Sequence, residues 1–294
     1  VQADGKRRCA GEMVSYVRPV TELIRARRSW RTYQASRPRP EDAEQIRSFI
    51  AGLGRPPFGS RVRIVLAELG HTVGDRVKGT YGVISGARSF LVGAMDQSES
   101  RPEDFGYLFE SVILCATSLG YGTCWVGGTF DRSAFADAVG LAGRETVCAV
   151  SPVGVPAKAR STIDRLFAAT AGSHTRKPFA ELFFMDDFES PMNERSAGSH
   201  LAALEMVRLA PSSSNRQPWR VLVKDGAYHF YLRRTPLYSL LFPKVDLQRL
   251  DMGIAMFHLE QTLCEQGVQG SWRTAAPSGD VRAGAMEYVA SFVP

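Results

Sequence analysis

The most regular hydrophobic pattern in the chain runs from Phe105 to Gly120. Its apolar side chains recur at intervals of three and four residues, at Leu108, Val112, Cys115, Ala116 and Leu119. These intervals place them on one face of a helix, and a glycine is typical of the position where a helix ends. We therefore predict a helix here, and a second long helix from about Leu247 to Gln266.

Shorter helices and strands are predicted around these two. The helices lie at 21–31, from about 41 to 53, at 135–139 and at 202–209. The strands, rich in β-branched and aromatic residues, lie at 62–66, 88–93, 123–126, 147–155, 220–224, 228–232 and 288–293. The helix at 21–31 would place Arg27 and Arg31 on one face, because they are four residues apart. This mixture indicates an α+β fold.

The two halves of the chain repeat one pattern. Gly106, Gly120 and Trp125 have the same spacings as Gly253, Gly267 and Trp272, across the same helix-turn-strand order. Upstream, the strand at 63–66 parallels the one at 220–223, and each follows a loop that contains proline. These two repeated patterns occur in the same order in both halves, which predicts a tandem duplication, equivalent to a dimer fused into one chain. We divide the chain into a leader at 1–20, a first half at 21–189 and a shorter second half at 190–294.

Composition excludes several classes of protein. A chain of 294 residues that is 44% hydrophobic can bury a large core, and no apolar run approaches the roughly 18 residues that span a bilayer. The leader has no apolar core of a secretory signal. The five cysteines are scattered without a C-x-x-C pair, which is typical of a reducing compartment. We expect a cytoplasmic protein without membrane contact.

A net charge of +6 could indicate a protein that binds nucleic acid. Lysines and arginines are dispersed, however, and form no long basic run, so local anion binding is favoured. The five histidines have no metal-ligand spacing, and the sequence holds no P-loop, G-x-S-x-G or H-E-x-x-H motif. We expect neither a nucleic-acid partner nor a metal.

One candidate for anion binding is the basic segment at Arg27, Arg28, Ser29 and Arg31. The planar fork of arginine matches the oxygens of a phosphate, and the serine adds a hydroxyl donor. A solvated basic helix face would give the same pattern, so both interpretations stay open.

A second candidate is the polar run between Pro211 and Trp219, which contains Ser212, Ser213, Asn215 and Gln217. Serine and asparagine side chains compete for their own backbone, and the residue before Pro218 is driven towards extended geometry, so no regular helix is expected. A capped turn without a ligand is the alternative.

Three further candidates are weaker taken singly. Gly127 and Gly128 follow a strand and would let a flat ligand approach the backbone, although a plain turn has the same composition. Arg176, with Lys177 as its substitute, precedes a proline, and Lys78 and Tyr81 lie in a glycine-containing segment. For the pair Arg176 and Lys177 and for the pair Lys78 and Tyr81, the alternative is a surface loop without a ligand.

The string P-S-S-x-N-x-Q-P-W at 211–219 resembles the flavin-contacting turn of the nitroreductase family. The element R-x-S-x-R at 27–31 is similar to the segment with which that family binds the phosphate of flavin mononucleotide (FMN). The resemblance extends from 21 to 272 and implies a nitroreductase-like α+β fold.

The resemblance also assigns roles. The phosphate and ribityl end of FMN would be held by Arg27, Arg28, Ser29, Arg31 and Arg176. The ring and ribityl chain would be lined by Pro211, Ser212, Ser213, Asn215 and Gln217. Gly127 and Gly128 would present backbone amides to the N5 edge, and Lys78 and Tyr81 would lie near the pyrimidine ring.

These elements are split between the halves. The first half has the arginine element but carries Pro56-Pro57-Phe58 where the serine turn should be, and the second half has the turn but no arginine element. In nitroreductase dimers each flavin lies between subunits. The split therefore implies one complete site between the halves and one lost site, in a subgroup with two fused nitroreductase-like domains. Such a chain would be a monomer with an internal pseudo-dimer.

The resemblance implies an FMN-dependent oxidoreductase. NADH or NADPH would reduce the flavin by hydride transfer, and a quinone, nitroaromatic or similar small oxidant would be reduced in a ping-pong cycle. The flavin carries the chemistry, so no catalytic side chain is assigned. The alternative is a flavin-binding or interaction protein without turnover, and a nucleic-acid binder comes third.

Overall fold

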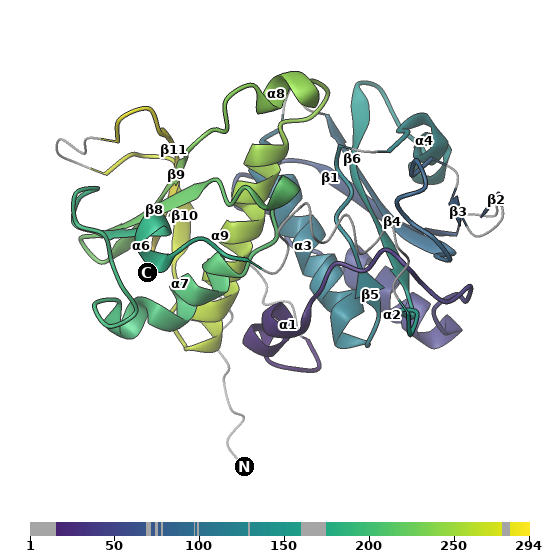
Figure 1. Ribbon diagram of the computed structural model, residues 1–294, viewed down its shortest axis with the longest axis horizontal. Coiled ribbons are helices and arrows are strands. Elements are labelled where there is room, and N and C mark those ends of the chain that lie inside the picture. Colours follow the sequence, from purple (N-terminus) through teal and green to yellow (C-terminus); the bar gives the residue numbers. More distant parts are fainter. Residues whose placement is uncertain are drawn as a thin grey trace, which may run out of the picture.

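The computed structural model describes residues 16–68, 72–73, 76–77, 79–96, 98, 100–128, 130–159, 175–277 and 283–294. Within these ranges, two β-sheets lie on either side of a central pair of helices (Figure 1). The central helices are α3 (Pro102–Ser118) and α9 (Leu247–Glu265), which agree with the two long helices predicted from the sequence. The fold is a mixed α+β architecture, as predicted.

The first sheet has four antiparallel strands in the order β1-β4-β6-β5. They are β1 (Val62–Glu68), β4 (Ser89–Asp96), β6 (Glu145–Gly154) and β5 (Gly122–Thr123). The second sheet has the order β10-β11-β9-β8-β7. Its members are β10 (Ser271–Arg273), β11 (Glu287–Val293), β9 (Ala227–Leu232), β8 (Trp219–Lys224) and β7 (Phe183–Met185). A separate hairpin pairs β2 (Thr72–Val73) with β3 (Arg76–Val77).

The two sheets share one strand order. In the first, β1 and β4 precede α3, β5 and β6 follow it, and the spatial order is β1-β4-β6-β5. In the second, β8 and β9 precede α9, β10 and β11 follow it, and the order is β8-β9-β11-β10. The additional strand β7 joins β8 in parallel.

The central helices pack backbone against backbone at two glycines. A Cβ atom on Gly106 would collide with the carbonyl oxygen of Leu250, and one on Gly253 would collide with the carbonyl oxygen of Glu103. Each glycine therefore meets the residue three positions before the other glycine. This reciprocal contact has the pattern of a two-fold interface, in which residue i meets j and j meets i.

The remaining helices cover the sheets and the ends of the central pair. The α-helices are α1 (Val20–Ala26), α2 (Pro40–Ala51), α4 (Ser133–Val139), α6 (Phe179–Leu182), α7 (Leu201–Arg208) and α8 (Tyr238–Leu241). Two short 3-10 turns are η1 (Gly198–His200) and η2 (Ser213–Asn215). No helix among the described residues is long and apolar enough to cross a membrane.

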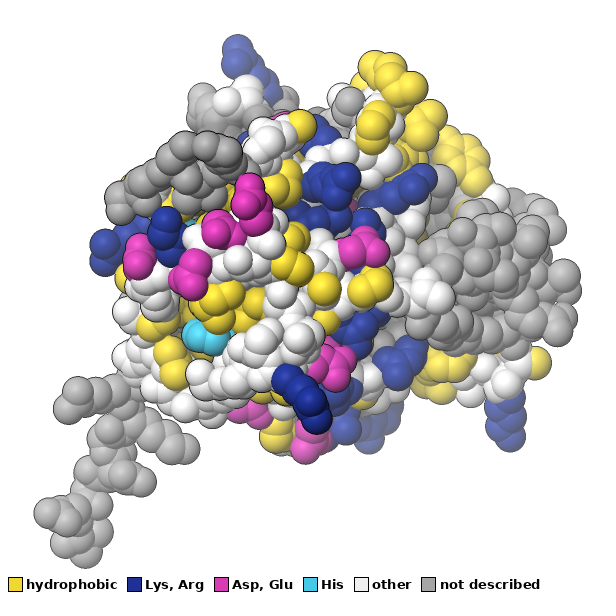
Figure 2. All heavy atoms as spheres, turned by 60° about the vertical axis from the view of Figure 1, so that its left-hand side comes forward, with side chains coloured by type: hydrophobic (Ala, Val, Ile, Leu, Met, Phe, Trp, Pro, Cys, Tyr) yellow, Lys and Arg dark blue, Asp and Glu magenta, His cyan; other side chains and the backbone are white. Residues whose placement is uncertain are grey.

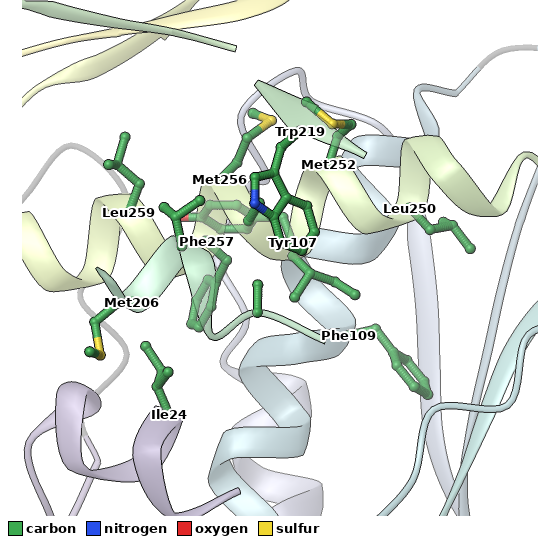
Figure 3. Close-up of a cluster of buried hydrophobic side chains, with 14 of the residues drawn as sticks. Ile24, Tyr107, Phe109, Met206, Trp219, Leu250, Met252, Met256, Phe257 and Leu259 are labelled. Atoms are coloured by element: carbon green, nitrogen blue, oxygen red, sulfur yellow. The ribbon is translucent and has the colours of Figure 1, made fainter. Parts of the chain in front are cut away.

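The largest hydrophobic cluster lies around α3 and α9. Figure 3 shows Tyr107 and Phe109 of α3 with Phe257 of α9, and Trp219 of β8 nearby. The rings of Tyr107 and Phe257 meet edge to face, with centroids 5.0 Å apart. All four side chains are buried, so the central helices and the second sheet share one core.

The first predicted helix is too long. The segment was expected to be helical to Arg31, but α1 ends at Ala26 and Arg27 already has ψ of 130°. The backbone then runs beside β5, where Ser29 bridges Thr123 and the Trp30 amide donates to the Thr123 carbonyl at 2.9 Å. Arg27 and Arg31 therefore do not share a helix face.

Candidate functional site

The arginine segment (residues 27–31) and the serine turn (residues 211–217) line one cavity of about 470 Å³. Of the residues predicted from the sequence, the lining contains Arg27, Arg28, Ser29, Arg31, Arg176, Pro211, Ser212 and Asn215. The cavity volume lies in the range of small-molecule sites, roughly 300–1,000 Å³. The fold thus brings together two motifs that lie far apart in the sequence.

Arg27 is the most enclosed cation of this cavity. Only 7% of the residue is exposed, and its Nε and Nη1 atoms have no hydrogen-bond partner among the described residues. The Glu110 Oε1 atom lies 3.8 Å from Nε, which is an ionic contact but too long for a hydrogen bond. Buried donors without an acceptor cost free energy, so this guanidinium is prepared for an anion from the cavity.

Arg176 connects the basic side of the cavity to the serine turn. Its guanidinium donates to the Asn215 Oδ1 atom at 3.1 Å and to the Leu209 carbonyl at 3.2 Å. Burial, followed by repulsion from Arg27, Arg208 and Arg28, lowers the pKa of Arg176 to about 10. It stays charged at neutral pH, and the repulsion means that a bound anion would stabilise the cluster.

Arg28 and Arg31 stand further from the centre of the protein than Arg27. Arg28 is exposed, and its Nη1 atom folds back to the carbonyls of Arg25 and Arg27, at 2.5 and 2.9 Å. Arg31 is half-buried. The cavity therefore has a buried cation, Arg27, on its inner side and the more exposed cations Arg28 and Arg31 towards solvent.

The serine turn has an unusual backbone. Ser214, Asn215 and Gln217 have φ of 49°, 53° and 49°, in the left-handed region that non-glycine residues rarely occupy. The turn is held by Asp251 on α9, whose two carboxylate oxygens accept from the Ser213 amide at 3.0 and 3.1 Å. Burial of Asp251 raises its pKa. Such strained turns are often found at binding sites.

Two predicted turn residues support the turn instead of lining the cavity. The Ser213 hydroxyl lies 2.6 Å from the Tyr238 hydroxyl. Gln217 is buried, its Oε1 atom accepts from the Lys177 amide at 2.9 Å, and its Nε2 atom donates to the Asn215 carbonyl at 3.2 Å. Neither belongs to the cavity lining. Gln217 holds Asn215, which does line it, and Ser213 shares the Tyr238 hydroxyl with the lining residue Ser214.

The glycine pair does not line the cavity either. A Cβ atom on Gly127 would meet the Leu247 side chain at 2.8 Å, and one on Gly128 would meet the Phe242 ring. Tyr81 is 75% exposed, has φ of 48° and is not part of the lining. Lys78 lies outside the described residues.

Several lining residues were not anticipated from the sequence: Ile24, Arg25, Trp125, Glu205, Leu209 and Ser214. Trp125 had been noticed only as a marker of the repeat. Its indole Nε1 donates to the Glu110 Oε2 atom at 2.7 Å, which fixes the ring at the cavity. A tryptophan near the end of a predicted strand, two residues before a predicted binding loop, was the available signal.

A second hollow is supported by a central helix in a similar way. This counterpart hollow is lined by Pro57, Phe58, Arg101, Trp272, Arg273, Thr274 and Ala275. Asp104 of α3 accepts there from the amides of Phe58 and Ser60, both at 2.9 Å, as Asp251 does at the serine turn. The Arg101 guanidinium carbon lies 3.9 Å from the Phe58 ring centroid.

No group of His, Cys, Asp and Glu side chains in the described ranges could hold a metal ion. Figure 2 shows Lys and Arg side chains scattered in small groups over one face, with uncharged, hydrophobic and acidic side chains between them. Hydrophobic side chains stand out at the top, where Figure 1 places α8 and where Leu237, Leu240 and Leu241 are each at least 70% exposed.

Comparison with solved structures finds several similar proteins. A crystal structure of a putative nitroreductase from Thermotoga maritima is similar over 99% of both chains, with a TM-score of 0.59 and 17% sequence identity, and shows the same fold. An FMN-dependent nitroreductase from Clostridium difficile matches 47% of this chain and 88% of its own, with 16% identity and a TM-score of 0.39. An NADPH:FMN oxidoreductase from Vibrio harveyi matches 47% and 68%, with 20% identity and a TM-score of 0.37.

No curated protein matches the chain. A family model described as "Putative TM nitroreductase" matches residues 19–263. The matched range runs from just before α1 to near the end of α9 and contains both the arginine segment and the serine turn. With most of its length inside that model, the chain belongs to this nitroreductase family.

Proposed function

We propose that the protein is an FMN-dependent NAD(P)H oxidoreductase that binds one FMN in the cavity between the arginine segment and the serine turn. The observation that carries the proposal is Arg27, a buried cation with two unpartnered donors among the described residues, at a cavity shared by both motifs. An arginine with donors to spare suits the phosphate oxygens of FMN.

The lining residues divide by chemistry. Arg27, Arg28, Ser29, Arg31 and Arg176 would hold the phosphate and the ribityl end, and Pro211, Ser212 and Asn215 would line the ribityl chain and ring. Ser213 and Gln217 would keep the turn in shape through Tyr238 and Lys177. Bound FMN would take a hydride from NADH or NADPH and reduce a quinone, nitroaromatic or similar small oxidant. Gly127, Gly128, Lys78 and Tyr81 remain assigned by resemblance only.

We also propose that the chain is a tandem duplication, with halves at 21–189 and 190–294, that acts as a monomeric pseudo-dimer. The shared strand order of the two sheets and the reciprocal packing of Gly106 and Gly253 support a duplication. The counterpart hollow would be the lost second site, since Phe58, with Arg101 over its ring, donates its amide to Asp104 as Ser213 does to Asp251. The free, buried thiols of Cys115 and Cys148 support a reducing compartment such as the cytoplasm.

The test is the flavin content of two matched double variants. In Arg27→Ala/Arg31→Ala, loss of two charge-assisted contacts should weaken FMN binding roughly a hundredfold or more, giving a folded but colourless protein. The control, Arg101→Ala/Arg273→Ala, removes two arginines from the counterpart hollow and should keep one FMN per chain, as the unaltered protein does. Stoichiometric FMN in the first variant would contradict the phosphate assignment, and two FMN per unaltered chain would contradict the lost site.

A flavin-binding protein without turnover is the second candidate. The observation in its favour is Phe242, whose ring packs on Gly128, so that the glycine pair is covered by a side chain. Steady-state oxidation of NADH and NADPH with menadione separates the two functions. Turnover supports the oxidoreductase, and bound flavin without turnover supports the second candidate.

A further inference from the structure

A buried hydrogen-bonded group lies directly behind the cavity. Glu110 on α3 has no exposed surface, and its Oε2 atom accepts from the Trp125 indole at 2.7 Å. Its Oε1 atom lies 3.1 Å from the His258 Nε2 atom on α9 and 3.8 Å from the Arg27 Nε atom. One carboxyl group therefore contacts two residues that line the cavity, and it is itself held from the opposite central helix.

The position of one proton on His258 follows from its partners. The His258 Nδ1 atom lies 2.8 Å from the Met206 carbonyl oxygen, which can only accept, so Nδ1 carries a proton. His258 Nε2 then meets Glu110 either as a second donor to a carboxylate or as the acceptor of a carboxyl proton. In both arrangements, His258 and Glu110 together carry no net charge.

Because the pair of Glu110 and His258 is neutral, Glu110 does not cancel the positive charge of Arg27. A lone buried carboxylate at 3.8 Å would neutralise the guanidinium and oppose the binding of an anion. With His258 on its other oxygen, Glu110 orients the Arg27 side chain while the positive charge stays available to the cavity. The unpartnered Nε and Nη1 atoms of Arg27, among the described residues, agree with this division.

We infer that Glu110 is a positioning residue for the phosphate of FMN, acting through Arg27 and Trp125 and balanced by His258. The inference rests on the proposed function, because it takes the phosphate to be the ligand of Arg27. Glu110 does not touch the ligand. It holds the Arg27 guanidinium and the Trp125 indole in the positions from which they line the cavity.

The chain contains a matched control for this role. Glu260 on α9 accepts from the Trp272 indole at 2.6 Å and from the Tyr107 hydroxyl at 2.7 Å, and it is also buried. Trp272 lines the counterpart hollow and not the cavity. Glu260→Gln thus disturbs a buried glutamate bonded to a tryptophan without touching the proposed phosphate site.

The experiment compares the affinities of FMN and riboflavin, which differ only in the phosphate. In Glu110→Gln, the FMN dissociation constant should rise roughly 10- to 100-fold, which is the value of one contact to a charged group, while that of riboflavin changes less than about twofold. His258→Gln should also weaken the binding of FMN much more than that of riboflavin, because it removes the side chain that balances the charge of Glu110. Glu260→Gln should give no split between the two flavins.

Arg27→Ala serves as the reference for the underlying function. If Arg27→Ala weakens FMN and riboflavin equally, the phosphate assignment itself fails. If Arg27→Ala separates the two flavins but Glu110→Gln and His258→Gln do not, only the positioning role fails. Tighter FMN binding in Glu110→Gln would overturn the inference as well, since Glu110 would then be a rival anion. Adding Glu110→Gln to Arg27→Ala should weaken FMN binding no more than riboflavin binding, because only the contact with Trp125 is left to lose.

Discussion

Two hollows of this protein are supported by similar side chains from the two central helices. Beneath the cavity, Asp251 holds the serine turn and Trp125 donates to Glu110. Beneath the counterpart hollow, Asp104 holds the loop at Phe58, and Trp272 donates to Glu260. The supporting side chains are alike in type and in contact.

The loops above these supports are different. The cavity receives the arginine segment and a turn of serines, whereas the counterpart hollow receives Pro57 and Phe58 and is occupied by Arg101 over the aromatic ring. Packing constrains the helices and their buried partners, because any change there disturbs the core. Loops carry the binding chemistry and can change without loss of the fold. The proposed function therefore depends on a few loop residues, and each prediction below addresses this comparison.

The largest effect is expected at the glycines that join the central helices. In Gly106→Ala and Gly253→Ala, the new Cβ would collide with a backbone carbonyl, so each variant should lose about 3 kcal/mol of unfolding free energy or fail to fold. Urea unfolding measures the loss. Gly52→Ala is the control, because its Cβ would meet the nearest atom at an ordinary 3.4 Å. A loss of unfolding free energy in only one of the two variants would contradict the equivalence of the two helices.

The sequence anticipates this helix pair because periodicity is a local signal. Apolar spacing located α3, and the repeated Gly-Gly-Trp spacing pointed to Gly106 and Gly253 as equivalents in α3 and α9. The motifs at 27–31 and 211–217 were likewise recognisable as strings, and the fold brings them to one cavity.

What the sequence did not give depends on contacts between distant segments. The helix predicted to Arg31 stops at Ala26 because the chain leaves it to pair with Thr123. The glycine pair was expected to face a ligand, but Leu247 and Phe242, more than a hundred residues later, pack on it. Glu110 showed only as a polar position in a hydrophobic helix, and its partners Trp125 and His258 are adjacent to it only in the folded chain.

A second prediction concerns the carboxylate under the serine turn. Burial raises the pKa of Asp251 above its ordinary value of 3.8, so the folded protein holds this proton to a higher pH than the unfolded chain does. The contribution of Asp251 to stability is then fully present below pH 3.8 and is lost as the pH rises through the folded pKa. We expect the stability of the unaltered protein, relative to Asp251→Asn, to fall across that window and then to level off.

Urea unfolding of both proteins over a series of pH values measures this difference. Asp104→Asn is the matched variant, since it removes the acceptor of the corresponding loop amides beneath the counterpart hollow. A stability difference between the unaltered protein and Asp251→Asn that does not change with pH would contradict the raised pKa.

The smallest effect is expected at Arg101. Its guanidinium stacks on Phe58 and donates to the Val289 carbonyl at 3.1 Å, and the side chain is about one-third exposed. Arg101→Ala should therefore lower the unfolding free energy by only about 0.5–1 kcal/mol, the range of an exposed cation–π contact. Thermal or urea unfolding will show whether the loss stays this small.

The flavin content of Arg101→Ala tests the comparison more sharply than its stability does. Removing the guanidinium opens the counterpart hollow beside Phe58 and Trp272, yet nothing in its lining resembles the arginine segment. The arginine that remains in that lining, Arg273, is exposed, so we expect it to hold no phosphate tightly and the ratio to stay at one FMN per chain. A rise towards two would show that Arg101 alone closes the second site. The difference between the two hollows would then lie in a single side chain and not in the absence of a phosphate-binding segment.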